Sequence, residues 1–153
     1  MPAVEDSITI AASPEALFAL SQDYALRREW DPFTREMQFL DGAKGPAPGV
    51  RVWGRAWNGL TMTVEYVTVQ PPHVVAMKMV RGPWFFASFA GSWRFEPAAG
   101  GATRVVFRYV FTTRPRWLPW LADPLVRWAF GRDIRARLRG LKDGAERKRL
   151  VAA

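Results

Sequence analysis

Two arginines and two tryptophans alternate along one short stretch of the chain. Arg51, Trp53, Arg55 and Trp57 are separated by single residues, and Asn58-Gly59 follows at once. On a β-strand alternate side chains share one face, so the stretch predicts a ladder of guanidinium and indole groups. Such a ladder could hold a carboxylate, phenolate or enolate and stabilise an oxyanion during a reaction. In the alternative interpretation, the arginine stems cover the tryptophans and the charged ends lie in water.

The Asn-Gly pair predicts the direction in which this ladder points. Between two alternating segments, here 50–57 and 60–69, Asn-Gly is typical of a two-residue type I′ turn. Such a turn fixes the register, and the register decides which residues share a face. The predicted pairs on the ladder's face are Trp57 with Leu60, Arg55 with Met62, Trp53 with Val64, and Arg51 with Tyr66. The opposite face would carry Val52, Ala56, Thr61, Thr63 and Glu65.

Two later hairpins predict which face is buried. A loop over 70–73 would pair Glu65 with Lys78, and the next hairpin, around the Gly/Ala-rich segment 97–102, can pair Glu96 with Arg104. Opposite charges that face each other across strands are typical of a solvent-exposed face, so the ladder is expected on the inner face. The other inner residues would be Val75, Met77, Met79, Trp93 opposite Phe107, Gly91 opposite Tyr109, and Phe89 opposite Phe111.

The hydroxyl groups of Tyr66 and Tyr109 are also candidates for the site. A buried phenol needs a hydrogen-bond partner, so either tyrosine could orient a ligand carbonyl or act as a proton donor. In the alternative, each is a core tyrosine bonded to the backbone or to water. The single histidine, His73, follows two prolines in a predicted loop, where a base would lie far from the inner face.

The elements that carry these residues predict a sheet and one long helix. Alternating segments indicate a strand over 4–10 and six more after residue 33, and Ser13-Pro14-Glu15 indicates the start of the first of two short helices. Residues 120–150 indicate the long helix, with Arg137 among its solvent-facing positions. Its apolar stripe comprises Leu121, Leu125, Trp128, Ile134, Leu138, Leu141 and Ala145, with one gap around Gly131.

This order of elements predicts an α+β fold in a single domain over residues 1–153. A curved antiparallel sheet of about seven strands would wrap around the C-terminal helix, with the two short helices after the first strand. The cavity between sheet and helix would hold a ligand. The residues predicted to contact it are Trp53, Trp57, Leu60, Met62, Val64, Met77, Met79, Phe89, Trp93, Phe107 and Trp128. The catalytic candidates are Arg51, Arg55, Tyr66 and Tyr109.

Composition narrows the classes of function. The net charge is +8, the chain has no cysteine and one histidine, and no apolar segment reaches the ~18–20 residues of a membrane span. These features predict a cytoplasmic protein with no metal site. No phosphate-binding loop, dinucleotide fingerprint or nucleic-acid motif is present, so we expect no cofactor and no nucleic-acid partner. The N-terminus shows no secretory pattern.

The basic C-terminal helix leaves a membrane interaction open. Residues 132–149 hold eight arginine and lysine residues against three acidic ones, and Trp117, Trp120 and Trp128 lie in or beside the helix. A basic helix with tryptophans can lie on an anionic bilayer. The alternative is a solvated basic face with the tryptophans in the core, and the position of Trp128 on the apolar stripe favours it.

Several segments resemble the START-like superfamily, in particular the bacterial polyketide cyclase/dehydrase and lipid transport group. They are Ile8 to Glu15 with Phe18, Trp30-Asp31-Pro32-Phe33, Arg81 to Phe85, Ser92 to Pro97, Gly101 to Val105, and Leu141-Lys142 with Glu146. The resemblance implies the helix-grip (Bet v 1-like) fold and an internal cavity for an apolar or aromatic small molecule. Aromatic polyketide cyclases of this kind are thought to steer an enolate with an inward arginine and a nearby tyrosine. Where some of them carry that arginine, this chain has Leu60.

Three hypotheses of function follow from the sequence. The first is binding of a hydrophobic small molecule, with or without an anionic group. The second is a cofactor-free cyclase or dehydratase that uses Arg55 and Arg51 with Tyr66 or Tyr109. The third is lipid handling at a membrane surface through the basic helix. The oligomeric state is left open.

Overall fold

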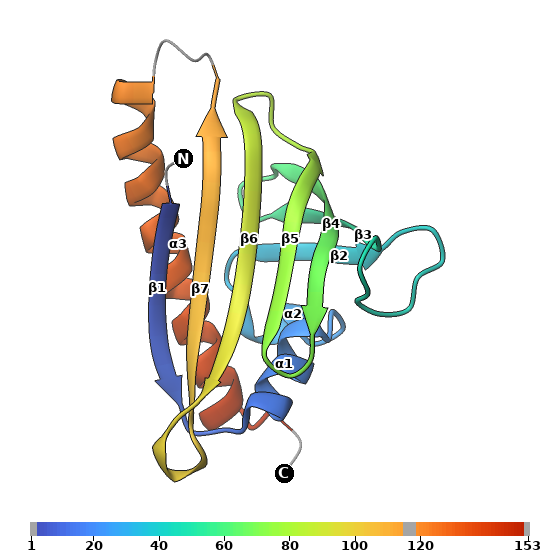
Figure 1. Cartoon of the computed structure of the whole chain (residues 1–153), viewed down its shortest axis with the longest axis vertical. Coiled ribbons are helices and arrows are strands. Elements are labelled where there is room, and N and C mark those ends of the chain that lie inside the picture. The colour runs from blue at the N-terminus through green and yellow to red at the C-terminus, as the bar shows by residue number, and fades with distance from the viewer. Residues whose placement is uncertain (1–2, 115–118, 152–153) are drawn as a thin grey trace.

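A computed structural model describes residues 3–114 and 119–151. Within these ranges seven strands form one antiparallel sheet in the order β1-β7-β6-β5-β4-β3-β2. In Figure 1, β2 and β3 run across the view whereas β1, β7 and β6 run along it, so the sheet is strongly curved. The strands are β1 (Ala3–Ile10), β2 (Thr34–Phe39), β3 (Arg51–Ala56), β4 (Thr61–Gln70), β5 (Val74–Arg81), β6 (Phe86–Pro97) and β7 (Thr103–Thr113).

Two short helices follow β1, as the sequence predicts. Helix α1 (Pro14–Gln22) begins after Ser13, whose Oγ accepts a hydrogen bond from the Ala16 N–H at 3.2 Å. Helix α2 (Arg27–Trp30) ends where Asp31 precedes Pro32. A 3₁₀ turn, η1 (Ala99–Gly101), joins β6 to β7. Figure 1 shows α1 and α2 together at one end of the sheet.

The long helix α3 (Pro119–Glu146) packs against β1 and β7. The predicted stripe is right in its C-terminal half, where Ile134, Leu138, Leu141 and Ala145 are all buried. It is wrong in its N-terminal half, where the buried side of the helix is marked by Phe130, which stacks on Phe86.

The displaced half of the stripe is explained by the geometry of the helix. Trp128 lies six residues before Ile134, which at 3.6 residues per turn is about 120° around the helix. The gap in the sequence pattern at Gly131 conceals this change of face. As a result Leu125 is 67% and Trp128 61% exposed. The side chains of residues 115–122, including Trp117, Trp120 and Leu121, lie outside the described part of the structure.

Two glycines let α3 approach α2 closely. A Cβ placed on Gly140 would lie 2.1 Å from the carbonyl oxygen of Trp30, and one on Gly144 would lie 2.8 Å from the Trp30 Cβ. No other residue type fits at Gly140 without moving the backbone of α2. This contact brings the α2–β2 segment against the inner side of α3.

The turn between β3 and β4 differs from the predicted one. The loop contains three residues, Trp57, Asn58 and Gly59, and is closed by a hydrogen bond from the Ala56 N–H to the Leu60 carbonyl at 2.9 Å. Among these three only Gly59 has a positive φ, of 86°, whereas a type I′ turn needs positive φ at both central residues. A type I turn followed by a glycine in the left-handed region fits, and it inserts one residue more than we predicted.

That one residue turns the predicted ladder outward. Arg55 pairs with Thr61, Trp53 with Thr63, and Arg51 with Glu65, so the predicted pairing of β3 is wrong. Val52, Gly54 and Ala56 occupy the inner face instead. The other registers that set the faces are confirmed: Glu65 opposite Lys78, Glu96 opposite Arg104, Trp93 opposite Phe107, Gly91 opposite Tyr109, and Phe89 opposite Phe111.

Candidate functional site

A cavity of about 170 Å³ lies on the concave side of the sheet. Its wall is mostly apolar and includes three methionines, whose unbranched side chains adapt easily to the shape of a neighbour. Rings of four aromatic residues close one side. These lining residues are Met37, Met62 and Met77, with Phe86, Phe89, Trp93 and Phe107. The volume is below the ~300 Å³ at which drug-sized sites begin, so a larger ligand requires side chains to move.

The structure brings eight of the predicted ligand or catalytic residues to this cavity and a ninth to its rim. Leu60, Met62, Val64, Met77, Phe89, Trp93, Phe107 and Tyr109 line the cavity, and Arg55 reaches its edge. Leu60 is 43% exposed and marks the mouth together with Asn58 and Pro83. That these residues contact a ligand remains a prediction.

The remaining candidates lie elsewhere. Arg51 forms a surface ion pair with Glu65 at 3.6 Å, and Arg55 forms one with Glu36. The half-exposed Trp53 and Trp57 lie on the outer face and in the turn, and Trp128 is on the solvent side of α3. Two inner-face residues also stand apart from the cavity: Met79 packs near Met62, and Tyr66 is bonded to Tyr24 and Gln22. The inward arginine ladder is therefore absent from the described structure.

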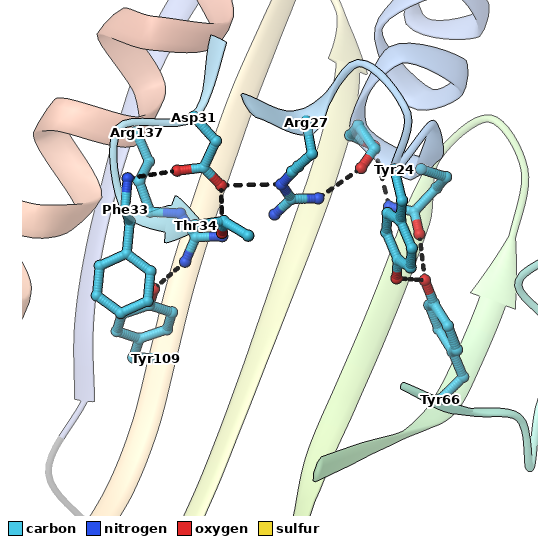
Figure 2. A network of polar contacts seen from close by, with 10 residues as sticks. Tyr24, Arg27, Asp31, Phe33, Thr34, Tyr66, Tyr109 and Arg137 are labelled. Atoms are coloured by element: carbon cyan, nitrogen blue, oxygen red, sulfur yellow. Dashed lines mark hydrogen bonds and ion pairs between the residues drawn. The ribbon is translucent and has the colours of Figure 1, made fainter. Parts of the chain in front are cut away.

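A different set of charged residues is buried at the inner end of the cavity. Figure 2 shows Asp31 between two guanidinium groups, Arg27 from α2 and Arg137 from α3. Asp31 Oδ2 lies 2.8 Å from Arg27 Nε and 3.0 Å from Arg137 Nη2. The same oxygen accepts a hydrogen bond from Thr34 Oγ1 at 3.0 Å, and Oδ1 accepts one from the Phe33 N–H at 2.9 Å. Asp31 thus joins α2, β2 and α3.

Arg137 connects this network to the cavity. Its Nη1 donates a hydrogen bond to the hydroxyl of Tyr109, and its guanidinium lies over the rings of Phe33 and Phe107 at 4.9 and 4.8 Å. Its Nε has no hydrogen-bond partner within residues 3–114 and 119–151. Arg137, Arg27, Thr34 and Tyr109 line the cavity. A cation and a phenol, close together at the end of an apolar cavity, can bind an oxygen atom that carries negative charge.

Burial and the neighbouring charges shift the pKa values of the groups in this network. Burial alone would raise the pKa of Asp31, but the charges of Arg137 and Arg27 and the hydrogen bonds from Arg27 and Phe33 lower it to about 2. Burial opposes the charge on Arg137, yet Asp31 and Tyr109 raise its pKa. Burial raises the pKa of Tyr109, despite the nearby charge of Arg137. At neutral pH the carboxylate and guanidinium are therefore charged and the phenol keeps its proton.

The sequence pattern predicts only ordinary roles for these two residues: Asp31, which precedes Pro32, would end the second short helix, and Arg137 would lie on the solvated face of the long helix. A signal for Arg137 was available, because it lies three residues after Ile134 and four before Leu141 and so belongs to the buried stripe. Asp31 gave no comparable signal, since Asp-Pro is common at the ends of helices. Arg27 could not be found from periodicity because α2 is only four residues long.

Comparison with known proteins agrees with the fold and with the family that the sequence resembles. The family model described as polyketide cyclase / dehydrase and lipid transport matches residues 1–146. The chain belongs to this family. Its helix-grip fold is that of START-like proteins, and these findings support a protein of the hydrophobic-ligand-binding or cyclase type. No curated protein matches the chain.

Several solved structures share the fold at low sequence identity. The Zhui aromatase/cyclase from Streptomyces sp. R1128 is similar with a TM-score of 0.81 and 20% identity, over 96% of this chain and 94% of that one. A START superfamily protein from Mycobacterium smegmatis has a TM-score of 0.80 and 13% identity, over 95% and 98%. The di-domain ARO/CYC StfQ from the steffimycin biosynthetic pathway has a TM-score of 0.75 and 19% identity, over 97% and 52%.

Other classes of site are not supported by the described residues. Nowhere in residues 3–114 and 119–151 do three His, Asp or Glu side chains lie close enough to hold a metal ion. None of the helices in these ranges combines the length and apolar character that crossing a bilayer requires. The exposure of Leu125 and Trp128 overturns the core assignment of Trp128, and contact of α3 with a membrane surface stays a prediction.

Proposed function

We propose that this family member binds a hydrophobic small molecule in the cavity between the sheet and α3. The observation that carries the proposal is the cavity itself, with apolar walls and one polar end. Methionine side chains on three strands allow the wall to adapt, and the open side near Leu60 and Pro83 gives a ligand access. The location we propose is the cytoplasm, which is the compartment expected for a chain without cysteine.

The test is binding of an apolar fluorescent probe to the intact chain. N-phenyl-1-naphthylamine should bind saturably to the wild type and brighten as it leaves water. Gly54→Leu should reduce its affinity at least about tenfold, because Gly54 lines the cavity and its nearest neighbours leave room for a Cβ, at 3.6 and 3.7 Å. Val67→Leu adds apolar volume on the exposed outer face and is the matched control.

Equal binding by wild type and Gly54→Leu, with both folded by circular dichroism, would refute the proposal. Native mass spectrometry of the protein purified from its own host supplies a second measurement. A retained ligand would appear as added mass, and the same mass should be absent from Gly54→Leu.

A cyclase-type reaction is the second candidate, and the contact between Arg137 and Tyr109 favours it. In that case the Tyr109 hydroxyl would hydrogen-bond the oxygen of an enolate formed from a poly-β-keto substrate, while Arg137 stabilised its negative charge. These residues would replace the outward-facing Arg51 and Arg55. The structural similarity to aromatase/cyclases supports the fold for this chemistry.

The enzyme hypothesis predicts that Tyr109→Phe lowers the rate of cyclised product formation about 100-fold, measured by chromatography with a poly-β-keto thioester. Tyr24→Phe is the matched control, because Tyr24 is also a hydrogen-bonded phenol but lies outside the cavity. Equal loss in both variants would indicate a structural effect and contradict the hypothesis.

A further inference from the structure

The charges at the inner end of the cavity do not balance. Arg27, Asp31 and Arg137 are 2%, 3% and 7% exposed, so two cations and one anion are buried together. Both ion pairs use the same carboxylate oxygen, Oδ2, and Oδ1 is already occupied by the Phe33 N–H. One carboxylate is therefore shared by two guanidiniums, and these three groups together carry one excess positive charge. A buried charge without a partner is strongly unfavourable.

The neighbouring elements do not restore the balance. Asp133 lies one turn before Arg137 on α3 and is half-buried. Burial raises its pKa, and it interacts with Arg132 as well as with Arg137. Within 4 Å, the ion pair that Arg137 forms in the described part of the chain is the one with Asp31. The facing strands contribute Tyr109 from β7 and Thr34 from β2, which are neutral.

The unbalanced charge faces the cavity. Asp31 stands behind the wall, whereas the charged residues that line the cavity within the described ranges are arginines: Arg27, Arg137 and, at the rim, Arg55. The polar atoms offered to a ligand at the inner end are chiefly donors. Tyr109 accepts a hydrogen bond from Arg137, and its own O–H has no acceptor among the described residues. Arg137 Nε also has no acceptor there, but this atom is itself buried.

We propose that the cavity selects ligands that carry one carboxylate group, bound at Arg137 and Tyr109. The inference rests on the proposed binding function, and it names the class of ligand. The anion supplies the missing negative charge, and the apolar body of the ligand lies against the methionine and phenylalanine wall. A ligand with a cationic amine is disfavoured by the same charge.

Isothermal titration calorimetry on the wild-type chain tests this with matched ligands. At pH 7 we expect 2-naphthoate to bind with a Kd at least about tenfold lower than 2-naphthylmethanol, which has a similar shape and no charge. 2-Naphthylmethylamine should bind more weakly than the alcohol. Decanoate and decanol form a second pair of ligands, for the case that the cavity binds a linear alkyl chain better than an aromatic ring.

The outcomes separate the two proposals. If alcohol and carboxylate bind equally well, the charge inference is wrong and the binding function stands. If neither pair binds, the binding function fails and the charge inference fails with it. If the amine binds best, the network is more negative than its residues indicate, which also overturns the inference.

A variant of Arg137 tests whether this side chain causes the preference for the carboxylate. Arg137→Met leaves Arg27 and Asp31 as a balanced pair, so we expect it to fold and to lose the preference for the carboxylate over the alcohol, which is measured as the ratio of the two Kd values. Arg135→Met, on the exposed side of the same helix, removes the same formal charge and should keep the preference. A carboxylate preference that survives in folded Arg137→Met would refute the assignment to Arg137. If that variant does not fold, the ligand pairs on the wild type still decide.

Discussion

Replacing Asp31 with asparagine should destabilise the fold far more than breaking an ion pair on the surface. The substitution keeps the size of the side chain and leaves two buried guanidiniums without an anion. Breaking a buried pair in this way costs about 3–5 kcal/mol. Glu36→Gln breaks the ion pair with Arg55, in which both side chains are about half exposed, and should change the free energy of unfolding by less than ~1 kcal/mol.

The pH dependence of Asp31 gives an independent measure of the same interaction. Its pKa is about 2 in the folded chain and about 3.9 in an unfolded one. Because the folded pKa is the lower one, the stabilisation is complete above about pH 5 and is lost as the pH falls toward 2. The difference between the two pKa values corresponds to about 2–3 kcal/mol, of which about 1 kcal/mol should be lost at pH 3.

The assay is urea unfolding of wild type, Asp31→Asn and Glu36→Gln, followed by tryptophan fluorescence between pH 7 and pH 3. The gap between wild type and Asp31→Asn should be largest at pH 7 and should narrow by about 1 kcal/mol at pH 3. A loss below ~1 kcal/mol at pH 7, or a gap that does not narrow, would show that Asp31 is not the buried counter-ion described here.

Three further changes test other parts of the structure. Arg51→Ala should leave ligand affinity unchanged in the probe titration, because its side chain is on the outer face; weaker binding would contradict the observed register. Gly140→Ala should destabilise the fold by more than 2 kcal/mol in urea unfolding because its Cβ meets the α2 backbone, whereas Gly131→Ala, with room for a Cβ, should gain up to ~1 kcal/mol. Trp128→Ala should change the free energy of unfolding little, whereas Phe130→Ala should lower it by about 2–3 kcal/mol and lower Tm with it. Equal effects of the two substitutions would contradict the observed orientation of α3.

The order of elements was predictable because each has a local signal. Ser13-Pro14 marks the start of α1, and the opposite-charge pairs Glu65–Lys78 and Glu96–Arg104 identify the outer face of the sheet. Each of these pairs could be predicted reliably because its register depends on one local hairpin only. They place Tyr109 and Trp93 on the inner face correctly, and with them much of the cavity wall.

The charged inner end of the cavity, formed by Arg27, Asp31 and Arg137, could not be predicted from local signals. The choice between a two-residue and a three-residue turn at Asn58-Gly59 depends on the φ of a single asparagine, which strand periodicity does not report. That choice moved Arg51 and Arg55 outward. Arg137 becomes a cavity residue only because Gly140 lets α3 approach α2, and a long-range contact of this kind leaves no mark in a local pattern.

The contact between Asp31 and Arg137 spans 106 positions in the chain. During synthesis, Arg27 and Asp31 emerge early and can pair with each other locally, since they are four residues apart. Arg137 can join them only after α3 has left the ribosome. A nascent chain arrested before α3 would hold a balanced ion pair and an open, uncovered sheet, so the excess positive charge at the inner end of the cavity forms only when α3 docks.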